Sequence, residues 1–421
     1  MSTTAAIETC DATADPLAVF ASPRFRKDPY PYLRSLREDS PVRPTAAGFH
    51  LLTRHADVEL VTRLAGDLVR SPDPEHLAEQ YPWAAEHRSM EFRLDHMLMK
   101  DPPAHTRLRR VIAREFTPRR IRDLTERITR TCARLADAVA EPLRDGESVD
   151  LHAEFSKQLS VQVISELLGV PPTDQPWMAE KVALFTEVFA GTDPSGLPTA
   201  DRYVAELEEY FSTLLAERRR APAGDLLSGL AGINDSDSDR LADRELMSMV
   251  LLLWIAGFET TAAGIDHGVL TLLAYPDQSE PLLGDEAARL GYVDEVLRRT
   301  GPAVFSPVPR FTTREVTLSG VTLPAGSQIR PVFAAANRDP EVFEDPDRFD
   351  PARDTGATLA FSHGIHNCLG SFLARTEMSV ALNLLHTRLP GLALAGEPEW
   401  TAAPPMHAPN SLPVGLEAAA V

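Results

Sequence analysis

Cysteine is scarce in this chain of 421 residues, which contains only Cys10, Cys132 and Cys368. Three cysteines give no disulfide framework, and a reducing cytoplasm is the simplest location for such a protein. The N-terminus is rich in Thr and Ala and lacks an apolar core flanked by basic residues, so the sequence predicts no signal peptide and no membrane anchor. We therefore expect a cytoplasmic protein without a membrane partner.

Positive charge is also in deficit, since 61 acidic residues outnumber 42 basic residues and the net charge is −19. This balance argues against nucleic acids and anionic membranes as main partners. One basic island stands out between positions 107 and 122. Such an island is either a docking face for an acidic electron carrier or a solvated helix face. Its members are Arg107, Arg109, Arg110, Arg114, Arg119, Arg120 and Arg122.

The sequence has no internal repeat, no low-complexity linker and no long Gly/Ser tract that would divide it. Hydrophobic residues make up 43% of the chain, which is enough for a packed core. We expect a single domain over residues 1–421, with residues 1–20 as a disordered N-terminal tail. Helical periodicity predominates and strand-like segments are short, which predicts a mainly α fold with small β-sheets (α+β). The predicted helices cover residues 28–38, 54–65, 104–115, 121–141, 152–168, 175–190, 199–219, 243–273, 285–300 and 369–387, and the predicted strands cover residues 48–53, 312–318, 328–333 and 412–416.

The residues around Cys368 predict a metal-binding thiolate. The segment Phe361-Ser362-His363-Gly364-Ile365-His366-Asn367-Cys368-Leu369-Gly370 leads into an amphipathic run, Leu369 to Leu385, that predicts a helix. A thiolate at a helix N-terminus is favoured by the helix dipole and by unpaired amide N–H groups. Gly364 and Gly370 allow the backbone to approach a flat ligand, and Phe361 can cover the sulfur. A lone cysteine is otherwise most often a small buried hydrophobe.

This segment resembles the haem-binding loop of the cytochrome P-450 family, F-x-x-G-x-x-x-C-x-G, with every fixed position filled. Ser362 stands where the family usually has Gly, and Asn367 stands where bacterial members usually have an apolar or aromatic residue; the Asn367 amide could tune the sulfur or face solvent. The resemblance implies the cytochrome P-450 fold, with haem b (iron protoporphyrin IX) between the long central helix and the cysteine-loop helix. It also implies that Cys368 is the axial iron ligand and that Phe361 and Gly370 border the haem.

A second motif, Ala256-Gly257-Phe258-Glu259-Thr260-Thr261, lies inside the long predicted helix, whose apolar run from Met249 to Phe258 is too short to cross a membrane. Threonine hydroxyls can bond to the preceding turn and open the helix, which leaves room for a small ligand. A polar kink in a buried helix is the alternative interpretation. The motif resembles the family's A-G-x-[DE]-T-T site. That resemblance implies that Thr260 hydrogen-bonds bound dioxygen, that Glu259 connects it to a proton supply, and that Ala256 and Gly257 border the haem.

A third motif begins at Asp101-Pro102-Pro103, where the prolines suit the first turn of a helix. His105 and Arg109, at i and i+4, then point the same way and could clamp a carboxylate. The resemblance implies that this pair holds a haem propionate. It also implies that Arg310 and His366 are two further propionate ligands.

A fourth motif, Glu295-Val296-Leu297-Arg298, places a carboxylate and a guanidinium on the same helix face. Any surface helix can carry such a pair as a solvated salt bridge of little energetic value. The pair resembles the family's E-x-x-R helix, and Arg348 falls where the family has the third member of this ion-pair set. The resemblance implies a structural role for all three.

The resemblance as a whole implies a soluble haem-thiolate monooxygenase of the bacterial type. Such an enzyme takes electrons that come ultimately from NAD(P)H through a ferredoxin reductase and a ferredoxin, and uses O₂ to hydroxylate or epoxidise its substrate. The composition suits an actinobacterial enzyme of secondary metabolite or antibiotic biosynthesis, acting on a medium-sized, largely apolar natural-product intermediate that is free or tethered to a carrier protein. The alternatives are an oxidative coupling enzyme without oxygen insertion and a non-catalytic haem protein that recruits a partner. Family position gives the substrate-pocket candidates Phe92, Phe189, Leu253, Val304, Phe305 and Ser411.

Overall fold

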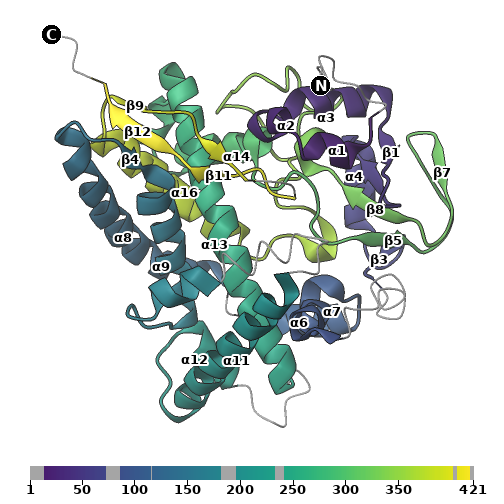
Figure 1. Ribbon diagram of the computed structural model, residues 1–421, viewed down its shortest axis with the longest axis horizontal. Helices are drawn as coiled ribbons and strands as arrows, with labels where there is room; N and C mark the ends of the chain where they lie inside the picture. Colours follow the sequence, from purple (N-terminus) through teal and green to yellow (C-terminus); the bar gives the residue numbers. More distant parts are fainter. Residues whose placement is uncertain are drawn as a thin grey trace, which may run out of the picture.

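Helices dominate the computed structural model, which describes residues 14–72, 86–114, 116–181, 196–232, 241–401 and 405–417 (Figure 1). The α-helices are α1 (Pro16–Phe20), α2 (Pro23–Lys27), α3 (Tyr30–Asp39), α4 (His55–Arg63), α6 (Arg88–Asp95), α7 (Ala104–Ala113), α8 (Pro118–Arg144), α9 (Lys157–Leu168), α11 (Leu197–Arg220), α12 (Leu226–Ala231), α13 (Asp243–Ala274), α14 (Glu286–Thr300), α15 (Phe333–Ala336) and α16 (Ser371–Arg388). Shorter helical segments are η2 (Met97–Met99), the π-helical η3 (His152–Ser156), η5 (Pro276–Gln278), η6 (Glu280–Leu283) and η7 (Gly364–His366).

The strands form small sheets near both ends of the chain. A five-stranded sheet has the order β1 (Val42–Pro44), β2 (His50–Leu52), β8 (Gln328–Pro331), β5 (Arg310–Thr312) and β3 (Val69–Arg70). A three-stranded sheet has the order β4 (Val149–Asp150), β12 (Pro413–Leu416) and β9 (Leu392–Leu394). Two hairpin-like pairs join β6 (Val316–Leu318) to β7 (Val321–Leu323) and β10 (Glu399–Trp400) to β11 (Pro409–Ser411). The predicted mainly α class with small sheets is confirmed.

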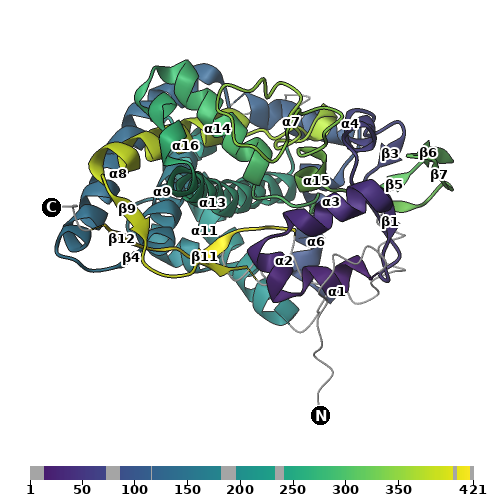
Figure 2. The ribbon, with the colours of Figure 1, turned by 90° about the horizontal axis from the view of Figure 1, so that it is seen from above.

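The central helix α13 organises the packing. Figure 2 looks nearly along it, with α8, α9 and α16 on one side and the N-terminal helices on the other. Among the described residues it is the helix that is long and apolar enough to cross a membrane, but 72% of its apolar window is buried inside the protein. A helix that is hydrophobic all round is expected in the core of a large protein. We therefore interpret α13 as a core helix.

Two glycines bring α13 close to α16. A Cβ on Gly264 would lie 2.9 Å from Met378 Sδ, and a Cβ on Gly268 would lie 2.6 Å from Leu382 Cδ1. Both contacts advance by four residues in the same direction, so the two helices run parallel where they touch. The N-terminal continuation of this α13 row therefore approaches the start of α16, which directly follows the cysteine loop.

The N-terminal tail prediction is wrong for part of residues 1–20. Pro16–Phe20 forms α1, and residues 1–13 lie outside the described part of the chain. Phe20 is only 2% exposed, and its ring centroid lies 4.6 Å from that of Phe25 and 5.8 Å from that of Phe305. Burial of these aromatic rings holds the segment in place.

Two predicted strands differ from the observed ones, since one is divided and the other ends earlier. Residues 312–318 do not form one strand, because β5 pairs with β8 and the chain then leaves the sheet to form the β6–β7 hairpin. The hairpin turn has φ values of 41° at Ser319 and 81° at Gly320, as a type I′ turn requires. The strand predicted over 328–333 ends at Pro331, and α15 follows. The helix predicted over 175–190 is described only as far as residue 181.

Candidate functional site

Cys368 lies between η7 and the first turn of α16, and its backbone N–H donates to the Phe361 carbonyl at 2.9 Å. Its side chain is accessible but recessed among protein atoms. Desolvation raises the pKa of the thiol, whereas the Gly370 N–H and the charges of Arg109 and Arg375 lower it. The net direction is opposite to the favoured thiolate that the helix N-terminus predicted. A bound metal cation would reverse it, because a coordinating thiol is deprotonated.

Gly364 and Gly370, the two glycines of the cysteine loop, have different structural roles. Gly364 has φ +69°, and a Cβ there would lie 2.2 Å from the Thr62 carbonyl oxygen. This glycine therefore lets the loop pack on α4, which corrects the expectation that it serves the approach of a flat ligand. At Gly370 an added Cβ would meet no described protein atom within 4 Å. Gly370 thus leaves open space beside the sulfur, as predicted for a cradle around a flat group.

Phe361 and Asn367 close the loop by their own contacts. The Arg375 guanidinium lies 4.4 Å from the Phe361 ring centroid, which is cation–π distance. The Asn367 amide donates to the carbonyls of Phe361 at 3.3 Å and Ser362 at 3.0 Å. The Asn367 amide therefore does not face solvent, since its donors are used inside the loop.

The predicted anion clamp assembles from three elements. The rings of His105 on α7 and His366 in η7 have centroids 4.5 Å apart, and both ring nitrogens of each lack a hydrogen-bond partner among the described residues. Burial and the neighbouring arginines lower the pKa of His105 to about 4 and that of His366 to about 2. The positive charges of Arg109 on α7 and Arg310 on β5 lower the pKa of both rings.

Arg310 is itself nearly buried, at 8% exposure, and desolvation lowers its pKa to about 10. One of its terminal nitrogens donates to the Leu98 carbonyl at 3.2 Å. Buried donors and cations of this density are stable only beside an acceptor of negative charge. The donor set therefore suits a ligand with anionic acceptors, such as carboxylates.

Thr260 and Ala256 lie on the same face of α13 as Gly264 and Gly268, one and two turns closer to the start of the helix. Both are exposed on a helix whose other residues are largely buried, so this part of the row borders open space near the cysteine loop. The Thr260 hydroxyl donates to the Ala256 carbonyl at 2.6 Å, the predicted bond to the preceding turn. The helix stays α-helical through the motif and is not opened. Glu259 is half-buried beside them.

Gly257 is placed differently from the expectation that it borders the haem. A Cβ on Gly257 would lie 2.8 Å from Ile164 Cδ1, so this glycine allows α9 to approach α13. The one-residue step from Ala256 turns the position by about 100° around the helix. Only Ala256 of the two shares the row with Thr260.

These observations together test whether a haem fits. Cys368 offers an accessible sulfur ligand, and Gly370 leaves room beside it. His105, His366, Arg109 and Arg310 form a donor set for two carboxylates, and Ala256 and Thr260 line the facing helix. A haem held by the Cys368 sulfur, with propionates toward the histidines and arginines, fits the residues present.

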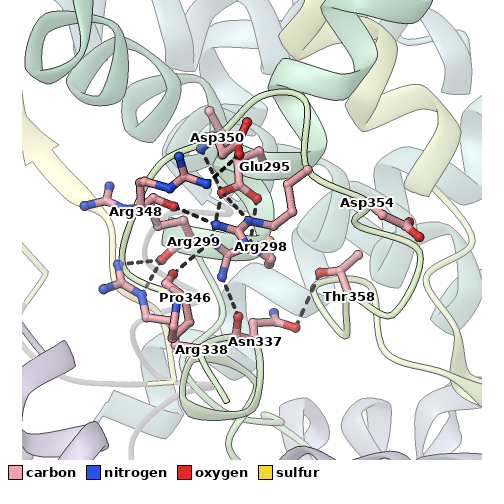
Figure 3. Close-up of polar contacts among 12 residues, drawn as sticks. Glu295, Arg298, Arg299, Asn337, Arg338, Pro346, Arg348, Asp350, Asp354 and Thr358 are labelled. Carbon is pink, nitrogen blue, oxygen red and sulfur yellow. Dashed lines mark hydrogen bonds and ion pairs between the residues drawn. The ribbon is translucent and has the colours of Figure 1, made fainter. Parts of the chain in front are cut away.

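Glu295 and Arg298 form the predicted ion pair, and both side chains are 0% exposed (Figure 3). The pair is bidentate, with distances of 2.7 Å from Nε to Oε2 and 2.8 Å from a terminal nitrogen to Oε1. Arg298 also donates to the carbonyls of Asn337 at 2.7 Å and Pro346 at 2.9 Å. The pair therefore ties α14 to the coil that precedes the cysteine loop.

The third member of this set is Arg353, which corrects the expectation for Arg348. Arg353 Nε donates to Glu295 Oε1 at 3.2 Å, whereas Arg348 is 60% exposed and pairs with Asp345 and Asp350. Arg348 contributes its carbonyl, which accepts from Arg353 at 3.3 Å. Both arginines lie in one short coil, and its path decides which side chain turns inward. No spacing in the sequence distinguishes them.

Because Arg353 rather than Arg348 contacts Glu295, alanine substitutions of the two arginines should lower the free energy of unfolding by different amounts. Arg353→Ala should lower the free energy of unfolding by roughly 2–4 kcal/mol, because it leaves the buried Glu295 with less compensation. Arg348→Ala should cost less than about 1 kcal/mol, since its ion pairs are exposed. Urea unfolding of the two variants makes the comparison. Equal losses, or a larger loss for Arg348→Ala, would contradict the assignment.

Four of the substrate-pocket candidates lie in the apolar core, namely Phe92, Leu253, Val304 and Phe305. Val304 and Phe305 are 1% and 6% exposed, and both belong to the apolar cluster of the N-terminal helices. The Phe305 ring stacks on Phe20 and also lies under Arg330, 5.8 Å from the guanidinium. These contacts satisfy the ring within the core.

Phe92 and Leu253 belong to the core around α13, and Ser411 lies on a C-terminal strand. Phe92 on α6 and Leu253 on α13 are 5% and 7% exposed, and the Ser248 hydroxyl donates to the Phe92 carbonyl at 3.2 Å. Ser411 on β11 hydrogen-bonds the Asp150 carboxylate through its side chain. Phe189 lies outside the described residues.

The basic island does not form one face. Arg107 pairs with Glu245 on α13, and the charge of Arg109 lowers the pKa of Cys368 and of His366. Arg120 donates to the Gly224 carbonyl at 2.7 Å. Arg110, Arg114 and Arg122 are exposed, and the Arg119 side chain lies outside the described part. Any docking surface built from the island would use only its exposed members.

A family model, relatives in sequence and solved structures all match this chain to cytochrome P450 proteins. The family model described as Cytochrome P450 matches residues 290–388. Cytochrome P450 BJ-3 of Bradyrhizobium diazoefficiens is 42% identical over 423 residues, covering 98% of each chain. Cytochrome P450 monooxygenase PikC of Streptomyces venezuelae is 38% identical over 398 residues, covering 93% of this chain and 91% of that protein. The solved structure of P450BioI in complex with hexadec-9Z-enoic acid ligated acyl carrier protein has a TM-score of 0.83 at 30% identity, covering 94% of this chain and 100% of that chain.

Proposed function

Because this chain belongs to the cytochrome P450 family, we propose that it is a haem-thiolate monooxygenase that hydroxylates or epoxidises a medium-sized, largely apolar natural-product intermediate. The single observation that carries this proposal is the accessible Cys368 sulfur near two histidines, His105 and His366, whose buried ring nitrogens lack partners among the described residues. The proposal treats the chain as one domain that works in the cytoplasm. Its electrons come from NAD(P)H through a ferredoxin reductase and a ferredoxin.

Each residue of the site has a distinct part in this proposal. Cys368 holds the iron, and the four cationic or donor side chains orient the porphyrin by its propionates. When bound, the haem supplies the oxygen chemistry, and the thiolate donates electron density to the iron. The apolar residues of α13 around the site keep bulk water from it.

Proton handling falls to the two polar residues of the α13 motif. The Thr260 hydroxyl now donates to the Ala256 carbonyl, and rotation about χ1 can turn it toward the open space that the residue borders. In that position it can donate a hydrogen bond to a small polar ligand. Glu259, one residue earlier, can exchange protons with it through water.

The named relatives support two modes of substrate delivery, as a free molecule or on a carrier protein. PikC is named as a monooxygenase, and P450BioI was solved with a fatty acid attached to an acyl carrier protein. This chain can take a free substrate or one tethered to a carrier. A first test is the Soret spectrum of the ferric protein, titrated with metabolite fractions and then with carrier-bound acyl groups. Spin-state conversion with one ligand supports the proposal, and a reduced CO complex without thiolate ligation overturns it.

Thr260→Ala should uncouple the reaction while the haem remains bound. Loss of the hydroxyl removes the proton donor at this position, so reducing equivalents should go to hydrogen peroxide and product formed per NAD(P)H should fall by about tenfold or more. Peroxide and product are measured in the same reconstituted assay. Unchanged coupling would remove Thr260 from the proposed proton route.

Thr271→Ala is the matched control for this experiment. Its hydroxyl makes the same kind of bond on the same helix, to the His267 carbonyl at 2.7 Å, but it is buried away from the cysteine loop. We expect its coupling to equal that of the unmodified protein. Thr260→Ser should retain most of the coupling, since it keeps the hydroxyl.

A further inference from the structure

Two uncommon features of the cysteine loop meet at Ser362. This residue has φ +57°, in the left-handed region that residues with a Cβ adopt only at an energetic cost. Its carbonyl accepts a hydrogen bond from the Asn367 side-chain amide at 3.0 Å. The costly backbone conformation and the side chain that holds it are thus five residues apart in the same loop.

The Asn367 amide also contacts the carbonyl that orients the cysteine. Phe361 O accepts from the Cys368 N–H at 2.9 Å and from Asn367 Nδ2 at 3.3 Å. The Phe361–Ser362 peptide therefore lies between the two bonds that Asn367 makes. Rotation of Ser362 toward an ordinary φ would turn this peptide and move its carbonyl away from Cys368.

We propose that Asn367 is a positioning residue for the Cys368 sulfur, and that it acts by holding Ser362 in its left-handed conformation. The opposite side of the loop is already fixed, because Gly364 packs against the Thr62 carbonyl on α4. On the side between Phe361 and the cysteine, the Ser362 N–H donates to the Leu359 carbonyl at 2.9 Å, and Asn367 adds the side-chain bonds to the carbonyls of Phe361 and Ser362. This inference rests on the proposed function, since it takes Cys368 as the iron ligand.

Asn367→Leu tests the inference in the haem-loaded protein, because leucine keeps a similar volume but has no donor. The ratio of thiol-ligated to thiolate-ligated CO complex should rise by about tenfold, which corresponds to about 1.4 kcal/mol. That is the size expected for two neutral hydrogen bonds. The reduction potential of the ferric/ferrous couple should shift in the same variant, because the sulfur is less well oriented.

Ser362→Gly provides the rescue, since glycine adopts a positive φ without a Cβ penalty. The double variant Ser362→Gly/Asn367→Leu should therefore return to within about twofold of the unmodified ratio. Equal defects in Asn367→Leu and in the double variant, including equal failure to load haem, would overturn the coupling. An unchanged ratio and an unchanged potential in Asn367→Leu would overturn the positioning role.

Asn383→Leu is the matched control. Asn383 lies on α16 and its amide donates to the Leu282 carbonyl at 2.7 Å, so the variant loses a similar bond away from the cysteine loop. Its CO spectrum and potential should match those of the unmodified protein, and a defect as large as that of Asn367→Leu would overturn the inference. If the unmodified protein itself lacks a thiolate signature, the proposed function fails, and this result is distinct from a failure confined to Asn367→Leu.

Discussion

Cys368→Ala should abolish thiolate ligation and all substrate turnover. The side chain is accessible and contributes little to the core, so the haem-free variant should fold and unfold at nearly the same urea concentration as the haem-free unmodified protein. Without sulfur, the His and Arg donors can still attract the propionates, and haem affinity falls. The expected readout is a reduced CO complex without the thiolate band, together with product at the background of the haem-free assay.

Cys132→Ala separates this effect from a general loss of cysteine. Cys132 lies on α8 and is 0% exposed, and burial raises the pKa of its thiol to about 12, so it is an unreactive part of the core. Its replacement should preserve the thiolate band and turnover, with a modest loss of stability from the small cavity. A thiolate band that survives in Cys368→Ala would overturn the assignment of the iron ligand.

Glu295→Gln should be the most destabilising of the single substitutions considered. The change leaves Arg298 charged at 0% exposure, with a neutral amide that keeps one acceptor in place of its bidentate carboxylate. Breaking a buried pair in this way costs roughly 3–5 kcal/mol, against a total stability of about 5–15 kcal/mol for a typical protein. Urea unfolding should show this loss, and haem loading should fall because the coil before the cysteine loop is no longer tied to α14.

Glu59→Gln is the control for this comparison. Glu59 and Arg63 form an i,i+4 pair on α4 at 2.8 Å, with the Arg63 side chain 61% exposed. Its loss should cost less than about 1 kcal/mol, since solvent screens an exposed pair. Similar costs for the two variants would show that burial does not set the energy of the Glu295–Arg298 pair.

Each motif that occupies a few adjacent residues could be predicted from the sequence. The cysteine loop, the Thr260 motif and the Glu295–Arg298 pair depend on spacings of one helical turn or one loop, and local backbone geometry converts such spacings directly into shared faces. The long core helix and the mainly α class follow from periodicity over many residues in the same way. The pair of His105 and Arg109 follows from i,i+4 spacing, whereas Arg310 and His366 came from family resemblance, because they are far from that pair in the chain.

Tertiary structure decided which neighbour each residue of these motifs meets. Arg353 rather than Arg348 reaches Glu295, across 58 residues of sequence, because the path of a coil turns one side chain inward. Gly257 lies where α9 approaches and Gly364 lies where α4 approaches, and at both positions a Cβ would collide with the neighbouring helix. The use of the Asn367 amide likewise depends on the positive φ of Ser362, which no local propensity predicts. The sequence by itself determined the family and predicted Cys368 as the iron ligand, and only the packed chain decided which residues surround that cysteine.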